Sequence, residues 1–299
     1  MTVKLGPLEL ENPILTASGT FGYGKEFAEF INLDRLGGIV TKSLTPNPRP
    51  GNPPHRVVEV TGAMLNSIGL ANVGVDLFIQ DKMPFLQTLE CKVIVNIAGE
   101  SLDEYLIVLT KLETVNNGID AYEINLSCPN VKEGGRTFGK DPRQVHRITS
   151  ALRELTNKPL IIKLTPEVSD IGELGLAAQE GGADIISAIN TFIGMAINTK
   201  KRKAVLGTIT GGFSGPALKP LALAKVYALS QVVSIPIIGI GGIFTVTDVV
   251  EFLLAGASAV QIGTANYIEP KISEKLVDDL HQYCEENKLE SITELIGTL

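Results

Sequence analysis

Residues 160–190 read LIIKLTPEVSDIGELGLAAQEGGADIISAIN, and this stretch contains a complete strand–helix–strand pattern. Residues 160–164 and 185–189 are short apolar runs rich in Ile, which is typical of strands buried on both faces of a parallel sheet. Between them, residues 170–179 have a helical pattern that ends before two consecutive glycines, which stop a helix. The stretch therefore predicts two parallel strands joined by one helix.

The same pattern repeats along the whole chain of 299 residues. Eight short apolar runs are predicted as strands: residues 13–17, 38–42, 93–97, 121–126, 160–164, 185–189, 237–240 and 259–262. The helical patterns between them include residues 101–114, 141–155, 170–179 and 245–254. Eight strand–helix units of about 37 residues, with no linker between them, favour one α/β domain over residues 1–299. We predict a (β/α)₈ (TIM) barrel rather than two doubly wound domains.

Composition and charge narrow the class of protein. The chain is 44% hydrophobic and 20% charged, as in globular proteins, and its net charge is −7. An acidic chain lacks the basic face that nucleic-acid binding requires, and the basic run at residues 200–203 is predicted to be a solvated loop. Three cysteines exclude a disulfide scaffold. Because we find neither a signal-peptide pattern nor an apolar run of about 18 residues, we expect a cytoplasmic protein that does not bind membranes.

Three connections are longer than a barrel needs. Residues 43–71 are rich in Pro, residues 131–140 are rich in Gly, and residues 191–216 contain five Gly. Each follows the C-terminal end of a predicted strand, and this is the face that carries active sites in the barrel fold. We predict that all three are insertions that form binding loops, with residues 131–140 as a lid.

The polar residues predicted at the strand ends are amides, hydroxyls, two lysines, one thiol and glycines, with no Asp, Glu or His among them. This set excludes the carboxylate pair of a glycosidase and a His-based zinc site. Glycines at residues 239–242 (GIGG) and 263–264 (GT) follow the last two strands. Backbone N–H groups at these positions commonly bind phosphate in barrels, so we predict a phosphate site there.

Lys42 and Lys163 are predicted at the barrel mouth, where buried ammonium groups need an anion. Each can serve as a phosphate ligand, a charge partner for a cofactor or a Schiff-base nucleophile, or can form a structural ion pair. We predict that Glu123 points into the barrel and pairs with a lysine. Cys128 is the thiol at the mouth, whereas Cys91 and Cys284 are predicted to be structural. Without a CxxC pair, we expect no iron–sulfur cluster in this chain.

Residues 123–130 (EINLSCPN) resemble the catalytic segment of the dihydroorotate dehydrogenases. Supporting segments are VTKS, NSIGL, IIKL and AINT, which begin at residues 40, 66, 161 and 188, and the resemblance covers residues 5–285. Cys rather than Ser at position 128 resembles the soluble class 1 enzymes. The segments GTFGYG, TPNPRPGN and KEGG, which begin at residues 19, 45 and 132, resemble type 1B within that class. Ala63 and Ser67 depart from this type, which has Gly and Ala there.

The resemblance implies oxidation of (S)-dihydroorotate to orotate in pyrimidine biosynthesis. Cys128 would take the C5 proton, and FMN bound to this chain would take the C6 hydride at N5. Electrons would then pass through a partner subunit that carries FAD and a 2Fe–2S cluster to NAD. The resemblance also implies a homodimer core within a heterotetramer. We expect no metal ion in this chain, because the predicted strand ends carry no Asp, Glu or His.

The resemblance also assigns binding residues. Lys42 would neutralise the orotate carboxylate or lie against the flavin, and Lys163 would stabilise the anionic reduced flavin near N1 and O2. The implied substrate-binding residues are Lys42, Asn66, Ser67, Ile68, Gly69, Leu70, Asn125, Asn130, Asn190 and Thr191. The implied FMN-binding residues are Ser18, Lys42, Ser43, Asn96, Asn125, Lys163, Ile189, Gly215, Gly241, Gly242, Gly263 and Thr264.

Three alternatives stay open at this point. The first is a flavin enzyme for another pyrimidine, similar to a dihydropyrimidine dehydrogenase subunit, which would not need a lysine for a carboxylate. The second is a non-redox lyase that uses Lys163 as a Schiff base. The third is a catalytically silent subunit that only binds a partner. The first alternative is distinguished by whether dihydroorotate or dihydrouracil reduces the flavin. The second would be a colourless protein that releases no FMN on denaturation.

Overall fold

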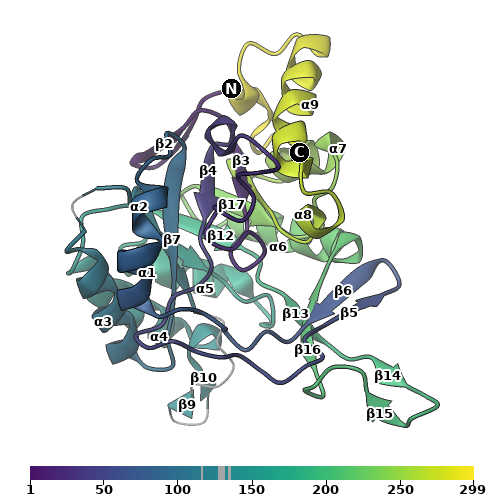
Figure 1. The fold of residues 1–299 in the computed structure, drawn as a ribbon. Helices are drawn as coiled ribbons and strands as arrows, with labels where there is room; N and C mark the ends of the chain where they lie inside the picture. The colour runs from purple at the N-terminus through teal and green to yellow at the C-terminus, as the bar shows by residue number, and fades with distance from the viewer. Residues whose placement is uncertain (116, 127–131, 134–135) are drawn as a thin grey trace.

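A computed structural model describes the chain apart from residues 116, 127–131 and 134–135 and the side chains of residues 132–133 and 136–138. Eight parallel strands close into a barrel, with helices around the outside (Figure 1). The strands are β3 (Ile14–Thr16), β4 (Gly38–Val40), β7 (Lys92–Ala98), β8 (Ala121–Asn125), β11 (Leu160–Lys163), β12 (Ile185–Ala188), β17 (Ile237–Ile240) and β18 (Ala259–Ile262). The predicted (β/α)₈ barrel is therefore confirmed, and each strand agrees with its predicted range to within two residues at either end.

The strands form where the sequence is apolar on both faces. In β11 and β12 every residue is buried, because one face packs inside the barrel and the other under the helices. Parallel pairing joins β11 to β8 and to β12. This pairing puts Lys163 of β11 beside Asn125 of β8, at the C-terminal edge.

The four helices predicted by pattern are observed, and each begins with a side-chain N-cap. They are α3 (Leu102–Leu112), α4 (Pro142–Arg153), α5 (Ile171–Glu180) and α7 (Val246–Leu254), capped by Ser101, Asp141, Asp170 and Thr245. The further helices are α1 (Val75–Asp81), α2 (Met83–Leu86), α6 (Lys219–Ser230), α8 (Ala265–Ile268) and α9 (Ile272–Glu286). None of the helices in the described part of the chain has the length and hydropathy needed to cross a bilayer.

The prediction of a helix after every strand is wrong for the first strand. Between β3 and β4 the chain makes turns and one short 3₁₀ helix, η1 (Leu33–Arg35). Gly19, Gly22 and Gly24 there have φ of 85°, 55° and 88°. These left-handed values interrupt any helix, so the segment 17–32 stays irregular.

An unpredicted hairpin precedes the barrel. Strands β1 (Val3–Leu5) and β2 (Leu8–Leu10) pair in antiparallel fashion and bury alternate residues. Its turn at Gly6 approaches the Asp184 carbonyl, directly before β12. The hairpin therefore packs at the N-terminal end of the barrel, opposite the predicted site.

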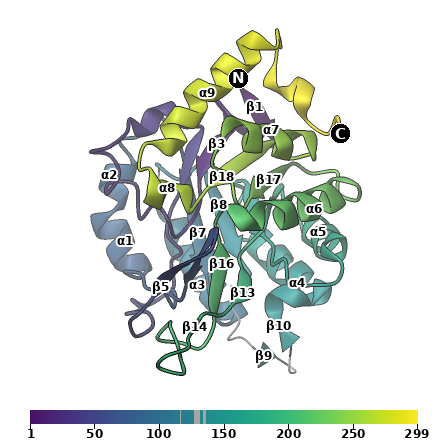
Figure 2. The ribbon, with the colours of Figure 1, turned by 90° about the vertical axis from the view of Figure 1, so that its right-hand side faces the viewer.

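The insertions at 43–71 and 191–216 form one sheet across the barrel mouth (Figure 2). Its strands, in the order β13-β16-β6-β5, are β13 (Phe192–Gly194), β16 (Gly211–Ser214), β6 (Ala63–Asn66) and β5 (Val57–Val60). A second hairpin of β14 (Ile197–Asn198) and β15 (Lys203–Ala204) carries the basic run 200–203, which is exposed as predicted. In the insertion 131–140, the described part contains β9 (Lys132–Glu133), β10 (Arg136–Thr137) and η2 (Phe138–Lys140).

Candidate functional site

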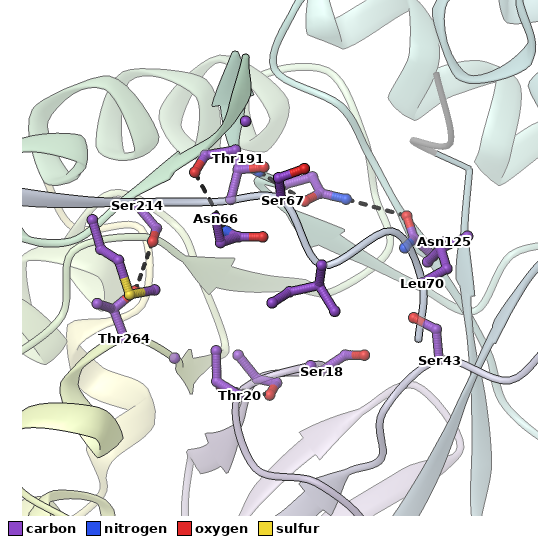
Figure 3. Close-up of a pocket in the computed structure, with 18 of the residues that line it drawn as sticks. Ser18, Thr20, Ser43, Asn66, Ser67, Leu70, Asn125, Thr191, Ser214 and Thr264 are labelled. Carbon is purple, nitrogen blue, oxygen red and sulfur yellow. Dashed lines mark hydrogen bonds between the residues drawn. The ribbon is translucent and has the colours of Figure 1, made fainter. Parts of the chain in front are cut away.

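A cavity of about 1140 Å³ lies at the C-terminal ends of the barrel strands, beneath the sheet formed by the two insertions (Figure 3). Ligand pockets usually measure about 300–1,000 Å³, so this one has room for a cofactor and a substrate together. In Figure 3, Ser214 and Thr264 lie at one end of the cavity, and Ser43 and Asn125 lie at the other. The cavity therefore extends between the glycine-containing turns of the last strands and the amides of the middle strands.

Most of the binding residues predicted from the sequence meet in this cavity. Those that line it are Ser18, Lys42, Ser43, Asn66, Ser67, Ile68, Gly69, Leu70, Asn125, Lys163, Ile189, Asn190, Thr191, Gly215, Gly241, Gly242, Gly263 and Thr264. Cys128 and Asn130 lie outside the described residues. Asn96 does not line the cavity, because its fully buried side chain turns into the barrel interior. The individual roles of all these residues remain predictions.

The predicted phosphate site is a concave backbone surface. Gly241 and Gly242 follow β17 with φ of 132° and 75°, and Gly215 before η3 (Pro216–Leu218) has φ of 106°. A Cβ on Gly242 would lie 2.6 Å from the backbone N of Lys219. Gly239, which was predicted to contribute, does not line the cavity, because it packs against the Phe252 ring on α7.

We expect the substitution Gly242→Ala to weaken flavin binding by at least tenfold. The new Cβ meets the Lys219 backbone, and the left-handed conformation costs about 1–3 kcal/mol, so the turn must move away from its present position. Titration of apoprotein with FMN measures the effect. A matched control is Gly62→Ala, because Gly62 also has a positive φ (67°) but lies outside the cavity lining. Equal FMN affinity in the two variants would contradict a phosphate site at Gly242.

The floor of the cavity is a polar layer inside the barrel, centred on Glu123. Its carboxylate is fully buried and accepts hydrogen bonds from Asn96 Nδ2 (2.6 Å), Ser187 Oγ (2.9 Å) and Gln261 Nε2 (2.6 Å). Lys163 Nζ lies 3.5 Å from Glu123 Oε1. The predicted pairing of Glu123 with a lysine is thus confirmed, and its partner is Lys163. Such a pair adds little net stability but is costly to break, because the remaining charge stays buried.

Lys42 is another cation that lines the cavity, together with Lys163, Arg49 and Lys140. It is half-buried, and no hydrogen bond or ion pair from its Nζ to another described residue is found. Burial and the nearby positive charge of Arg56 lower the pKa of Lys42, and Glu26 opposes the shift. An anion in the cavity would therefore gain a strong electrostatic partner.

Amide side chains line the cavity from its middle, at Asn66, to the end opposite Thr264, at Asn125 (Figure 3). Asn190 Nδ2 donates to Asn125 Oδ1 (3.1 Å), and Asn190 Oδ1 accepts from the Thr191 N–H (2.8 Å). Asn66 Nδ2 donates to the Gly212 carbonyl (3.3 Å) of β16. These amides are prearranged and can offer both donors and acceptors to a planar heterocycle.

The strand ends predicted from the sequence carry no carboxylate, but two carboxylates in the loops just beyond them were overlooked. Glu100 and Glu167 both line the cavity, just beyond the ends of β7 and β11. Glu100 pairs with Arg49 (2.5 Å), and Glu167 pairs with Lys140 (3.0 Å) and accepts from the Ile193 N–H (2.9 Å). Both carboxylates are therefore engaged with the insertions. The signal available in the sequence was their position only a few residues after a predicted strand.

Ser67, which departs from the type 1B pattern, links the two large insertions. Its Oγ accepts from Asn52 Nδ2 (2.8 Å) and lies 2.6 Å from Thr208 Oγ1. Asn52 and Thr208 also line the cavity, and neither was singled out by sequence reasoning. The hydroxyl therefore stabilises the roof of the cavity.

Comparisons with known proteins agree with this geometry. A family model described as dihydroorotate dehydrogenase matches residues 1–284. Dihydroorotate dehydrogenase B (NAD(+)), catalytic subunit, of Geotalea uraniireducens (strain Rf4) is 50% identical over 299 residues, covering 100% of this chain and 98% of that protein. The protein of the same name from Geobacter sulfurreducens is 48% identical, with the same coverage. The crystal structure of DHODH from Eimeria tenella in complex with ferulenol is similar in fold, with a TM-score of 0.80 and 23% identity, covering 99% of this chain and 88% of that one.

Proposed function

Because the chain belongs to the dihydroorotate dehydrogenase family, we propose that it oxidises dihydroorotate to orotate in pyrimidine biosynthesis as the catalytic subunit of an NAD-linked enzyme. The observation that carries the proposal is the assembly, in one cavity, of a glycine turn for phosphate, two cations and a group of amides. These residues come from all parts of the chain and meet only in the folded barrel. The cavity is large enough for flavin and substrate together.

We infer that the cofactor of this chain is FMN. Gly215, Gly241, Gly242 and Gly263 line the cavity, where backbone N–H groups could bind a phosphate, and Lys163 adds a positive charge at the floor. Bound FMN would supply the acceptor for the hydride that leaves C6 of the substrate. Lys163, fixed by Glu123, would favour negative charge that develops on the acceptor.

For the proton, we propose Cys128 as the general base at C5. Loss of this proton and of the C6 hydride leaves the C5–C6 double bond of orotate. Glu100 and Glu167 are already paired at the rim, so they are less suited to this role. The loop 131–140 would close over the substrate and exclude water during the reaction.

We propose that Lys42 binds the substrate carboxylate and that Asn66, Asn125, Asn190 and Thr191 bind the pyrimidine ring. The amides supply donors and acceptors, as the alternating groups of the ring require. Within the described residues, the ammonium of Lys42 is left for a ligand. This feature favours dihydroorotate over a pyrimidine without a carboxylate.

Orotate affinity should fall as pH rises through the lowered pKa of Lys42. The folded-state pKa lies below the ordinary lysine value of about 10.4, so the ammonium that binds the carboxylate is lost at lower pH than for an exposed lysine. Loss of a hydrogen bond to a charged group should weaken binding about 10–100-fold. Orotate Kd measured against pH in the Cys128→Ala background tests this without thiol titration.

The matched variant for this test is Lys42→Arg. A guanidinium stays protonated over the whole range, so the increase in orotate Kd that deprotonation of Lys42 causes should be absent in this variant. If Lys42→Arg shows the same increase in Kd with pH as Lys42, another group controls binding. The assignment of Lys42 to the carboxylate would then be incorrect.

We propose that electrons leave through a partner subunit that carries FAD and a 2Fe–2S cluster and reach NAD there, in a heterotetramer around a homodimer of this chain. The name "catalytic subunit" of the relatives supports a partner. Dihydroorotate should reduce NAD only when this chain and the partner are both present. NAD reduction by the chain alone would contradict the proposed route.

Two alternatives are separated by simple assays. A dihydropyrimidine dehydrogenase-like enzyme would be reduced by dihydrouracil as rapidly as by dihydroorotate, and Lys42→Met would not change this preference. A Schiff-base lyase would be colourless and would need Lys163 as a free amine. In the structure, Lys163 Nζ lies 3.5 Å from Glu123 Oε1 and is engaged in that ion pair.

A further inference from the structure

Two buried amide oxygens at the floor of the cavity have no hydrogen-bond donor among the described residues. They are Asn96 Oδ1 and Gln261 Oε1. Both amide NH₂ groups donate hydrogen bonds to Glu123. Both residues are buried, with 0% of Asn96 and 1% of Gln261 exposed. An unsatisfied buried polar atom costs about as much as a lost hydrogen bond, so each of them requires a partner.

The orientation of the Gln261 amide is fixed by chemistry. A carboxylate can only accept hydrogen bonds, so the group that faces Glu123 at 2.6 Å must be the Gln261 NH₂. The carbonyl oxygen is therefore the atom left for a neighbour on another side. Gln261 lines the cavity, whereas Asn96 does not.

We propose that Gln261 is a cofactor-binding residue whose Oε1 accepts a hydrogen bond from a ribityl hydroxyl or ring N–H of FMN, with Glu123 as the positioning residue that fixes the amide. This inference rests on the proposed function, because it takes FMN as the occupant of the cavity. FMN has several hydroxyl and N–H donors. Which of them donates to Gln261 Oε1 would depend on which lies closest to this atom when FMN is bound. Glu123 thus positions two residues that line the cavity: Lys163, through an ion pair, and Gln261, through a hydrogen bond.

The test compares Gln261→Met with Ser187→Ala. Ser187 also donates to Glu123, at 2.9 Å, and is fully buried, but it does not line the cavity. Each variant removes one hydrogen bond to the same carboxylate, and only the first removes the proposed acceptor. FMN titration of apoprotein should show about tenfold weaker binding for Gln261→Met and a change of less than twofold for Ser187→Ala. Equal weakening in both variants, or unchanged affinity in Gln261→Met, would overturn the proposal.

A second variant guards against misfolding of the first. Gln261→Asn keeps the amide but shortens the side chain by one methylene, so the acceptor retreats from the cavity. It should also weaken FMN binding, and retained full affinity would count against the inference. Wild-type protein distinguishes this inference from the proposed function. If the wild-type chain binds no FMN, the proposed function fails. If the wild type and all variants bind FMN equally well, only the role of Gln261 is contradicted.

Discussion

Replacing Cys128 by Ala should slow flavin reduction by dihydroorotate by a factor of about 10²–10⁴, the usual contribution of a general base. FMN content and orotate affinity should remain near those of wild type, because Ala removes the proton acceptor and leaves the phosphate site, Lys42 and the amides unchanged. Anaerobic stopped-flow mixing with dihydroorotate, followed by the visible absorbance of the flavin, measures the rate. Rapid reduction of the flavin in this variant would exclude Cys128 from the reaction.

Cys91→Ala is the matched control for Cys128→Ala. Cys91 is buried directly before the first residue of β7. Desolvation, together with the charges of Asp34 and Asp120, raises the pKa of its thiol to about 12. It should therefore stay protonated at any working pH, and its replacement should not change the rate of flavin reduction. A thiol at position 128 with an ordinary pKa of about 8.5 also predicts that the wild-type rate rises toward pH ~8–9.

Replacing Lys163 by Met should lower the free energy of unfolding of the apoprotein by about 3–5 kcal/mol. The substitution leaves the Glu123 carboxylate fully buried without its cation, while three neutral donors remain. Urea unfolding at neutral pH measures the loss. The exposed pair of Lys140 and Glu167 provides a control, and Lys140→Met should cost less than about 1 kcal/mol.

The double variant Lys163→Met, Glu123→Gln identifies the cause of this loss. Gln at position 123 removes the buried charge that Met at position 163 leaves unpaired. We therefore expect the double variant to be more stable than Lys163→Met alone by at least about 1 kcal/mol. A double variant no more stable than the single one would show that packing, rather than the buried charge, explains the loss.

The barrel was predictable because its strands are buried on both faces. Runs such as residues 160–164 and 237–240 are mostly apolar whichever neighbour they pair with, so local sequence is sufficient to identify them. Because all eight strands are parallel, the glycine turns and polar residues that follow them lie together at the C-terminal edge of the barrel. For this reason, the predicted binding residues converge in the cavity although they are far apart in the chain.

The features that sequence analysis missed depend on long-range pairing. The segment GGFS in β16 has low strand propensity and becomes a strand only because β6 and β13 lie on either side of it. Glu100 and Glu167 reach the cavity because loops turn back toward the mouth after β7 and β11. The polar alternation within a strand does not extend into such loops. Gln261 was missed although it is the polar residue of the otherwise apolar strand β18, because it precedes the strand end, where polar residues were sought.

Anaerobic titration of the purified chain with (S)-dihydroorotate, followed by flavin absorbance and by orotate analysis, tests the proposed reaction directly. We expect a yellow protein that releases FMN on denaturation and whose flavin bleaches with one orotate formed per flavin. A colourless protein, or a flavin that stays oxidised in the presence of dihydroorotate, would contradict the proposed reaction.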